Sequence, residues 1–149
     1  ALDLIGRKTA SSQGAGLKLM LAEIEAFAKA NEGNDALAEF IAPLRAKADE
    51  WAKLTLATLQ RAATNPDELG AASCDCLFYS GYVVLAYWWA RSVAAADASA
   101  QSEAFKQAKR ETARFYFARV LPRTLSHAAA IQSGAEPLMA MADAHFGEG

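Results

Sequence analysis

The chain has 149 residues, a formal net charge of −2 and 21% charged residues, which are values of a single globular domain. This balance excludes a disordered polyelectrolyte and argues against a dedicated nucleic-acid-binding protein, which would carry an excess of Lys and Arg. Alanine supplies 36 of the 149 residues, whereas Val and Ile together supply eight. Because Ala favours helices and β-branched residues favour strands, we expect an all-α protein.

The cysteine content and the length of the longest apolar run further limit the class of protein to which the chain can belong. Two cysteines, Cys74 and Cys76, are too few for a disulfide framework or a four-cysteine zinc site, so we expect a cytoplasmic protein. The longest apolar run, Leu77–Ala90, is shorter than the roughly 20 residues of a membrane span, and we expect no such span. The chain begins at Ala1 rather than Met, and we expect it to be part of a longer protein.

The first 30 residues predict a linker followed by a helix. Residues 1–16 resemble a short helix end and a flexible connection that contains two serines and two glycines. A helical stripe then starts at residue 17, and Asn31 and Gly33 indicate where it stops. The residues of the stripe are Leu17, Met20, Leu21, Ile24, Phe27 and Ala28.

Two longer helices are expected next. The pattern from Asp35 to Ala63 keeps its phase across Pro43, so we expect a kinked helix rather than two helices. At the start of the next helix, Asn65 can cap, Pro66 suits the first position, and Glu68 can reach back to the cap. That helix, 65–96, is apolar nearly all round, which indicates several packing neighbours. The adjacent Trp88 and Trp89 should each be at least half buried, on different sides of it.

The carboxy-terminal part predicts a fourth long helix and a short one. The fourth covers residues 100–132 with a kink at Pro122, and Gly134 follows its end. Pro137 opens a last helix over 138–146. Four long helices with short connections predict an antiparallel up-down four-helix bundle with a short C-terminal helix.

No residue of this chain is predicted to be catalytic, cofactor-binding or metal-ligating. Cys74 and Cys76 lie two positions apart on a helix and point in opposite directions, which favours ordinary packing over a shared metal. The Glu-x-x-His motif of di-iron bundles is absent, because Thr124 and Ala142 stand three residues before His127 and His145. A surface or helix-end position is expected for both histidines.

A basic stretch lies within the fourth predicted helix, with three aromatic residues among its cations. Such a pattern can bind nucleic acid or a phosphorylated ligand. We favour a solvated face paired with carboxylates such as Glu39, Asp49 and Glu50, and expect no nucleic-acid partner. The cations are Lys106, Lys109, Arg110, Arg114, Arg119 and Arg123, and the aromatic residues are Phe115, Tyr116 and Phe117.

Residue order at both ends of the chain resembles one branch of the acyl-CoA dehydrogenase family. Leu2-Asp3-Leu4-Ile5-Gly6-Arg7-Lys8 is similar to the segment that follows the catalytic glutamate in that branch. Lys109–Phe146 is similar to its terminal helices, and Tyr79-Ser80-Gly81-Tyr82 with Trp88 to its central helix. The branch includes enzymes similar to 3-methylmercaptopropionyl-CoA dehydrogenase.

The resemblance implies a flavoprotein parent of fatty acid metabolism. In that family a glutamate removes the α-proton of an acyl-CoA thioester and FAD accepts a hydride from the β-carbon. Residues 1–16 would be the tail of the catalytic helical bundle plus a linker, and 17–149 the added C-terminal domain. The chain itself would bind no cofactor and perform no catalysis. It would pack on the catalytic domains of its parent or stabilise a homo-oligomer. The alternative is a free-standing helical interaction module without enzymatic activity.

Overall fold

The computed structural model describes residues 1–12 and 14–147, and within them all regular structure is helical. The long helices are α1 (Ala15–Ala30), α2 (Asp35–Ala62), α3 (Asp67–Asp97), α4 (Glu103–Phe115) and α5 (Thr124–Ser133). A π-helix, η1 (Asp3–Ala10), precedes them. A π-turn, η2 (Tyr116–Val120), and a 3₁₀ turn, η3 (Leu121–Arg123), join α4 to α5. The short α6 (Glu136–Met139) and the 3₁₀ turn η4 (Asp143–Phe146) follow.

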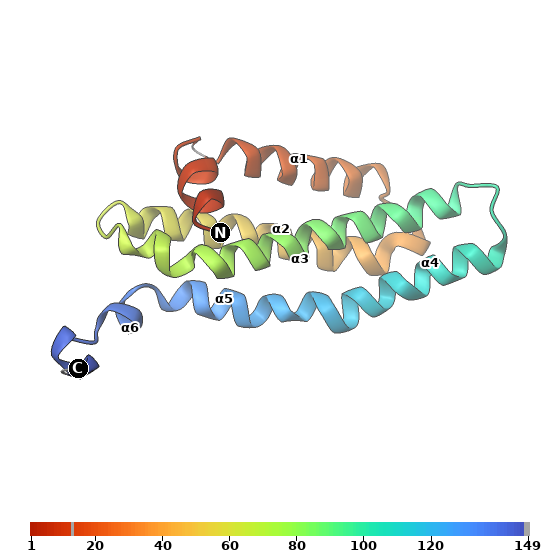
Figure 1. The fold of residues 1–149 in the computed structure, drawn as a ribbon. Helices are drawn as coiled ribbons and strands as arrows, with labels where there is room; N and C mark the ends of the chain where they lie inside the picture. Colours follow the sequence, from red (N-terminus) through yellow and green to blue (C-terminus); the bar gives the residue numbers. More distant parts are fainter. Residues whose placement is uncertain (13, 148–149) are drawn as a thin grey trace.

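Helix α3 is central to the packing. It contacts α2 most extensively, then α5 and α4, while α1 packs mainly on α2. In Figure 1, α1 lies above α3, the continuous α4–α5 segment lies below it, and α2 lies behind it. The core between these helices is built from Ala and a few large side chains, of which Tyr79, Phe40, Leu37, Leu44 and Val83 are fully buried.

The predicted positions of the first three long helices agree with the structure to within a few residues, but the prediction of a last helix over 138–146 is wrong. The structure has the short α6 and η4 there, separated by the non-helical residues 140–142. Helix α2 runs through Pro43 without interruption, as expected from its unbroken stripe. Asn65 accepts a hydrogen bond from the N–H of Asp67 at 3.1 Å and so serves the start of α3. Glu68, expected to reach back to this cap, instead binds Arg61 and the N–H of Ala135.

The expected fourth helix is not regular along its length. After Phe115 the backbone widens to a π-turn and then tightens to a 3₁₀ turn that contains Pro122. Proline lacks an N–H and its ring crowds the carbonyl four residues earlier, so the regular ladder cannot continue there. The irregular turns absorb this defect over eight residues, and α5 then continues along α3.

The amino-terminal segment packs on the chain itself. Ile5 is 2% exposed and belongs to the main core cluster, whereas Leu2 is 59% exposed. With Leu2, Leu4 and Ile5 as its few apolar residues ahead of a glycine-containing linker, this segment is expected from the sequence to stay disordered or to dock on another copy. Ile5 instead contacts the core beneath η1, which lies against α3.

Candidate functional site

The outward side of α3 is an unusual surface for a central bundle helix. Four large apolar residues on this helix are 41–54% exposed. They are Leu77, Phe78, Leu85 and Trp88. Monomeric proteins seldom expose such a run of large apolar side chains on one face, so the surface is a candidate for contact with another protein.

Trp88 departs from its expected burial. Its ring is 53% exposed, and it contacts the Tyr87 ring edge-on at 5.5 Å between centroids. The guanidinium of Arg91 lies 5.1 Å above the Trp88 ring. Trp89, by contrast, is partly buried and packs near Tyr116, with centroids 6.4 Å apart. Only Trp89 therefore has the burial expected of both rings, because no segment of the described chain covers Trp88.

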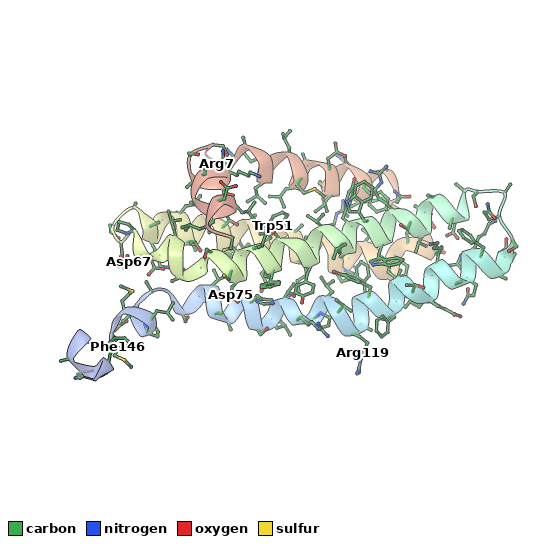
Figure 2. All side chains as sticks on the ribbon, in the orientation of Figure 1. Arg7, Trp51, Asp67, Asp75, Arg119 and Phe146 are labelled. Atoms are coloured by element: carbon green, nitrogen blue, oxygen red, sulfur yellow. The ribbon has the colours of Figure 1, made fainter. Side chains whose placement is uncertain are left out.

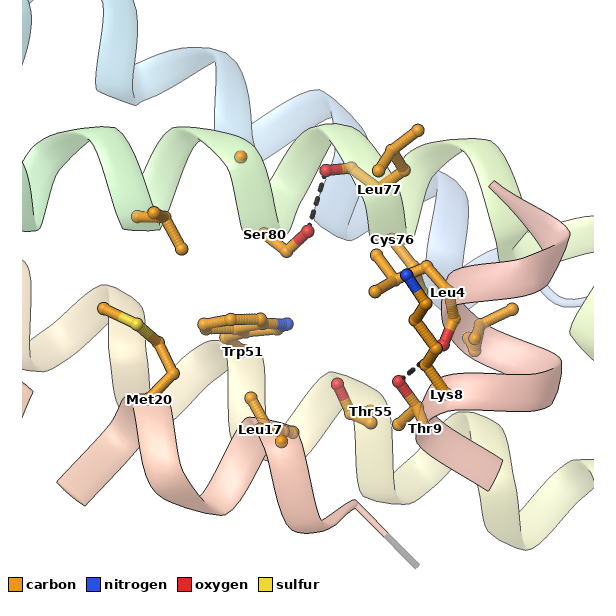
Figure 3. A pocket seen from close by; sticks show the side chains of 14 residues that line it. Leu4, Lys8, Thr9, Leu17, Met20, Trp51, Thr55, Cys76, Leu77 and Ser80 are labelled. Atoms are coloured by element: carbon orange, nitrogen blue, oxygen red, sulfur yellow. Dashed lines mark hydrogen bonds between the residues drawn. The ribbon is translucent and has the colours of Figure 1, made fainter. Parts of the chain in front are cut away.

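A cleft of about 480 Å³ lies beside this face, between η1, α1, α2 and α3. Figure 3 shows the Trp51 ring between α1 and α3, with Met20 and Leu17 below and Ser80 above. Lys8 is the one charged residue of the lining, and its ammonium lies 3.7 Å from the carboxylate of Asp3. The hydroxyls of Thr9 and Ser80 donate to backbone carbonyls in their own helices. The cleft is therefore suited to apolar groups.

A histidine–carboxylate pair lies on the opposite flank of α3. Nδ1 of His127 is 2.7 Å from Oδ1 of Asp75. The imidazole stacks on the rings of Phe78 and Tyr82, at 5.4 and 5.7 Å between centroids. Figure 2 places Asp75 on the side of α3 that faces α5. The sequence predicts a surface or helix-end position for this histidine. It lies near the start of α5, but it is partly buried and connects α5 to α3. The two residues are 52 positions apart, so no local motif could have revealed the pair.

Cys74, Cys76 and His145 lie in ordinary core or surface positions, as the sequence predicts. Cys76 is buried and Cys74 exposed, and both are free thiols. Burial, with the nearby Asp75 carboxylate, raises the pKa of the Cys76 thiol to about 11, so it stays neutral and unreactive at pH 7. His145 is exposed in η4. Among the described residues, no group of three or more His, Cys, Asp or Glu could hold a metal ion.

Three of the six cations of the basic stretch are paired with acids: Lys106 with Glu103, Arg110 with Asp97 and Arg114 with Glu39. Arg114 binds Glu39 through two nitrogens at 2.8–3.0 Å, which confirms one of the three expected acidic partners. Arg110 binds Asp97 at 2.7 Å instead of an acid on α2. Glu50, also an expected partner, binds Lys47 and the Tyr79 hydroxyl. Figure 2 shows Arg119 on the side of its helix away from α3.

The Tyr79–Glu50 hydrogen bond is a partly buried polar contact at the edge of the core. The Tyr79 hydroxyl donates to Glu50 Oε2 at 2.7 Å. Burial, and the adjacent carboxylate, raise the pKa of Tyr79 well above its usual value. Burial opposes ionisation of Glu50, but hydrogen bonds from Lys47 and Tyr79 outweigh it, and the pKa of Glu50 is lowered. This contact fixes the register of α2 against α3 and offers no free acid or base.

Helix α3 also has the length and composition of a membrane-crossing helix. Its most apolar window has a mean hydropathy of 1.4, and 39% of that window is buried in the described structure. A central core helix meets the same criteria, and α3 packs on α2, α4 and α5. This observation is therefore weak evidence for a membrane span.

Comparison with known proteins gives one family. Comparison with curated proteins gives no match. The model of the family described as "Acetyl-CoA dehydrogenase C-terminal like" matches residues 20–142, from α1 to the segment after α6. This range includes the whole exposed face of α3, and it begins after η1. Since the match extends over most of the sequence, the chain belongs to the acetyl-CoA dehydrogenase C-terminal-like family.

Proposed function

We propose that this chain is the C-terminal domain of an FAD-dependent acyl-CoA dehydrogenase of the branch similar to 3-methylmercaptopropionyl-CoA dehydrogenase. The parent enzyme would introduce an α,β double bond into an acyl-CoA thioester. The domain itself would be a non-catalytic scaffold that packs on catalytic domains or stabilises a homo-oligomer. The observation that carries the scaffold role is the exposed apolar face of α3.

The helical arrangement supports this role. We assign it as an antiparallel up-down four-helix bundle whose four rods are α1, α2, α3 and the continuous α4–α5 segment. In such a bundle each helix buries one stripe and leaves a polar outer face. Helix α3 departs from that pattern, because its outer face is also apolar. A helix that is apolar on every side is suited to a position between its own bundle and a second domain or subunit.

The described cleft does not fit FAD. A flavin dinucleotide needs N–H donors or cations at its pyrophosphate, commonly at a helix N-terminus. The cleft offers Lys8, already near Asp3, and the hydroxyls of Thr9, Ser80 and Thr55, of which the first two donate to their own backbone. We therefore assign FAD, the catalytic base and the acyl-CoA site to other domains of the parent. A cytoplasmic location and a role in fatty acid metabolism are part of the same proposal.

The alternative is a free-standing helical interaction module. The exposed face of α3 is compatible with it, because such a face fits any protein partner. The two proposals differ in the expected size of the polypeptide that the native cells make. Intact-mass measurement of the polypeptide that contains this sequence in its native cells should give a mass far above 15.9 kDa. A native product of 15.9 kDa would support the module instead.

An activity measurement tests the non-catalytic role. Purified chain 1–149 should show no flavin absorbance and should not reduce an electron-acceptor dye with any acyl-CoA. Proton abstraction needs a base within hydrogen-bond reach of the substrate, and we place that base in another domain. A yellow protein that reduces the dye would contradict the proposal.

A further inference from the structure

The exposed residues of α3 follow a helical repeat of seven. Residues 74, 78, 81, 85 and 88 alternate in steps of four and three, which places them on one line along the helix. Between Glu68 and Arg91 the one charged residue is Asp75, which binds His127 on the α5 side. The segment from 74 to 88 is therefore a continuous uncharged seam about 21 Å long at 1.5 Å per residue. It is referred to below as the α3 seam, with Cys74, Leu77, Phe78, Gly81, Leu85 and Trp88 as its members.

The α3 seam is uncovered because the other sides of the helix are already occupied. Tyr79, Val83, Ala86, Tyr87 and Ala90 are buried in the chain's own core. Asp75 binds His127 on α5, and Val84 borders the cleft toward α1, while Phe78 and Leu77 form the two edges of the seam. Figure 1 shows η1 beside the amino-terminal half of α3 and no helix in front of the rest of α3, between α1 and the α4–α5 segment.

We propose that the α3 seam binds the α3 seam of a second copy of the chain, with the two helices antiparallel and a two-fold axis at Gly81. This inference rests on the oligomer-stabilising role proposed above and names its partner and contact. Gly81 is exposed, and a side chain added there would meet nothing within 4 Å in the chain. A glycine on an open helix face lets the backbone of a second helix approach closely, so Gly81 is the natural crossing point.

Side-chain sizes on the two sides of Gly81 are complementary under this symmetry. A two-fold axis at residue 81 places position 74 opposite position 88 and position 77 opposite position 85 of the partner. The small Cys74 thus faces the large Trp88, and Leu77 faces Leu85. A two-fold interface must be self-complementary in this way, and pairing small with large residues permits close packing.

The charges at the two ends of the seam agree with the antiparallel orientation. Asp67 lies at the amino-terminal end and Arg91 at the carboxy-terminal end, and both are exposed. With the axis at Gly81, Arg91 of one helix lies opposite position 71 of the other, about 6 Å along the helix from the partner's Asp67 at 1.5 Å per residue. A parallel arrangement would place like charges together. Unlike a membrane or a polar surface, a second copy satisfies the apolar seam and its charged ends at the same time.

The first test measures association of the whole chain 1–149. Sedimentation equilibrium of the wild-type chain at about 50 μM should give twice the 15.9 kDa monomer mass. Leu85→Asp should give a folded monomer, because a buried carboxylate without a partner opposes association. Leu56→Asp is the matched control, since Leu56 on α2 is 58% exposed and Leu85 50% exposed. The control should remain a dimer, and circular dichroism should show all three proteins helical.

The second test locates the axis by cross-linking. In a Cys74→Ser background, Gly81→Cys should form a disulfide-linked dimer on mild oxidation, because residues on a two-fold axis meet their own copies. Leu56→Cys in the same background should stay monomeric on a non-reducing gel. Equal cross-linking of both variants, or none at position 81, would overturn the Gly81 axis.

Two other results would overturn the dimer. A wild-type chain that is monomeric at 50 μM and sediments with phosphatidylcholine vesicles would assign the seam to a membrane. A monomer that ignores vesicles but binds purified catalytic domains of the parent, with Leu85→Asp abolishing that binding, would assign the seam to those domains. Neither result changes the outcome of the intact-mass test of the proposed function. Failure of the dimer proposal can therefore be distinguished from failure of the proposed function.

Discussion

The carboxylate of Glu68 accepts a hydrogen bond from Nε of Arg61 at 2.8 Å, across the turn between α2 and α3. Its other oxygen accepts the N–H of Ala135 at 3.1 Å, and Nη2 of Arg61 donates to the carbonyl of Ile131 at 2.8 Å. These bonds join the end of α2, the start of α3 and the end of α5. The Arg61 hydrogen bond, with the Ala135 N–H, lowers the pKa of Glu68 below its usual 4.5.

The lowered pKa of Glu68 predicts an acid-sensitive contribution to stability. A carboxyl whose pKa is lower in the folded state stabilises the fold above its unfolded pKa of 4.5, and this contribution is lost as pH falls through the folded value. Glu68→Gln should therefore destabilise the chain at neutral pH and flatten the decline of stability below about pH 5. Urea unfolding across this range measures both effects. Glu103→Gln is the control, because the Glu103 side chain is 86% exposed. An unchanged pH profile in Glu68→Gln would contradict the prediction.

Gly134 should not tolerate a side chain. Its φ of 73° and ψ of −166° lie in a region that essentially only glycine adopts. A Cβ there would also approach Oε1 of Glu68 to 3.0 Å. Gly134→Ala should cost about 1–3 kcal/mol in thermal or urea unfolding.

Gly70 supplies the opposite control. It lies inside α3 with nothing within 4 Å of an added Cβ. Gly70→Ala should therefore stabilise the chain by about 0.5–1 kcal/mol. Equal effects of the two substitutions would show that backbone geometry at Gly134 is not limiting.

Phe40 is expected to be a main contributor to core stability. It is fully buried on α2, and its ring lies 5.2 Å from that of Phe117 in η2. Phe40→Ala should cost about 3–5 kcal/mol, because it leaves a cavity between α2 and the irregular turn. Phe115→Ala, at a ring 61% exposed, should change stability by about 0.5 kcal/mol or less. Comparable losses at both positions would contradict the packing of η2 on α2.

Helix positions could be predicted from this sequence because periodicity and end signals agree. Asn31 and Gly33 end α1, and Asn65 begins α3 within two residues of the expected start. The π-turn at Tyr116–Val120 was not predictable, because a proline signals a defect without fixing how many residues absorb it. The contacts of Glu68 could not be predicted either. A capping box would use the same carboxylate that binds Arg61 and the N–H of Ala135, and the packing of α5 near this turn favours the second arrangement.

The apolar composition of the candidate site on α3 could be predicted from the sequence, but which side of the helix is exposed could not. The apolar character of 65–96 led to the expectation that all its sides would be covered, and hence that Trp88 would be buried. Which side of α3 stays open depends on where α1 and α5 pack, and those contacts lie far apart in sequence. The Asp75–His127 pair could not be predicted for the same reason, because it also depends on how α5 packs on α3.

The domain boundary near residue 16 remains a prediction, and hydrogen exchange tests it. One side chain, Ile5, is buried beneath η1, and full burial of an Ile contributes about 1.5–3 kcal/mol. Global stability of a domain is about 5–15 kcal/mol, so η1 should open without unfolding α3. In the Leu85→Asp variant, expected to be monomeric, the amides of Leu4 and Ile5 should exchange much faster than that of Val83 in α3. Ile5→Ala should speed exchange at Leu4 further and leave Val83 unchanged. Protection of Leu4 and Ile5 equal to that of Val83 would show that η1 and the bundle unfold as one unit, and that the boundary near residue 16 is not a domain boundary.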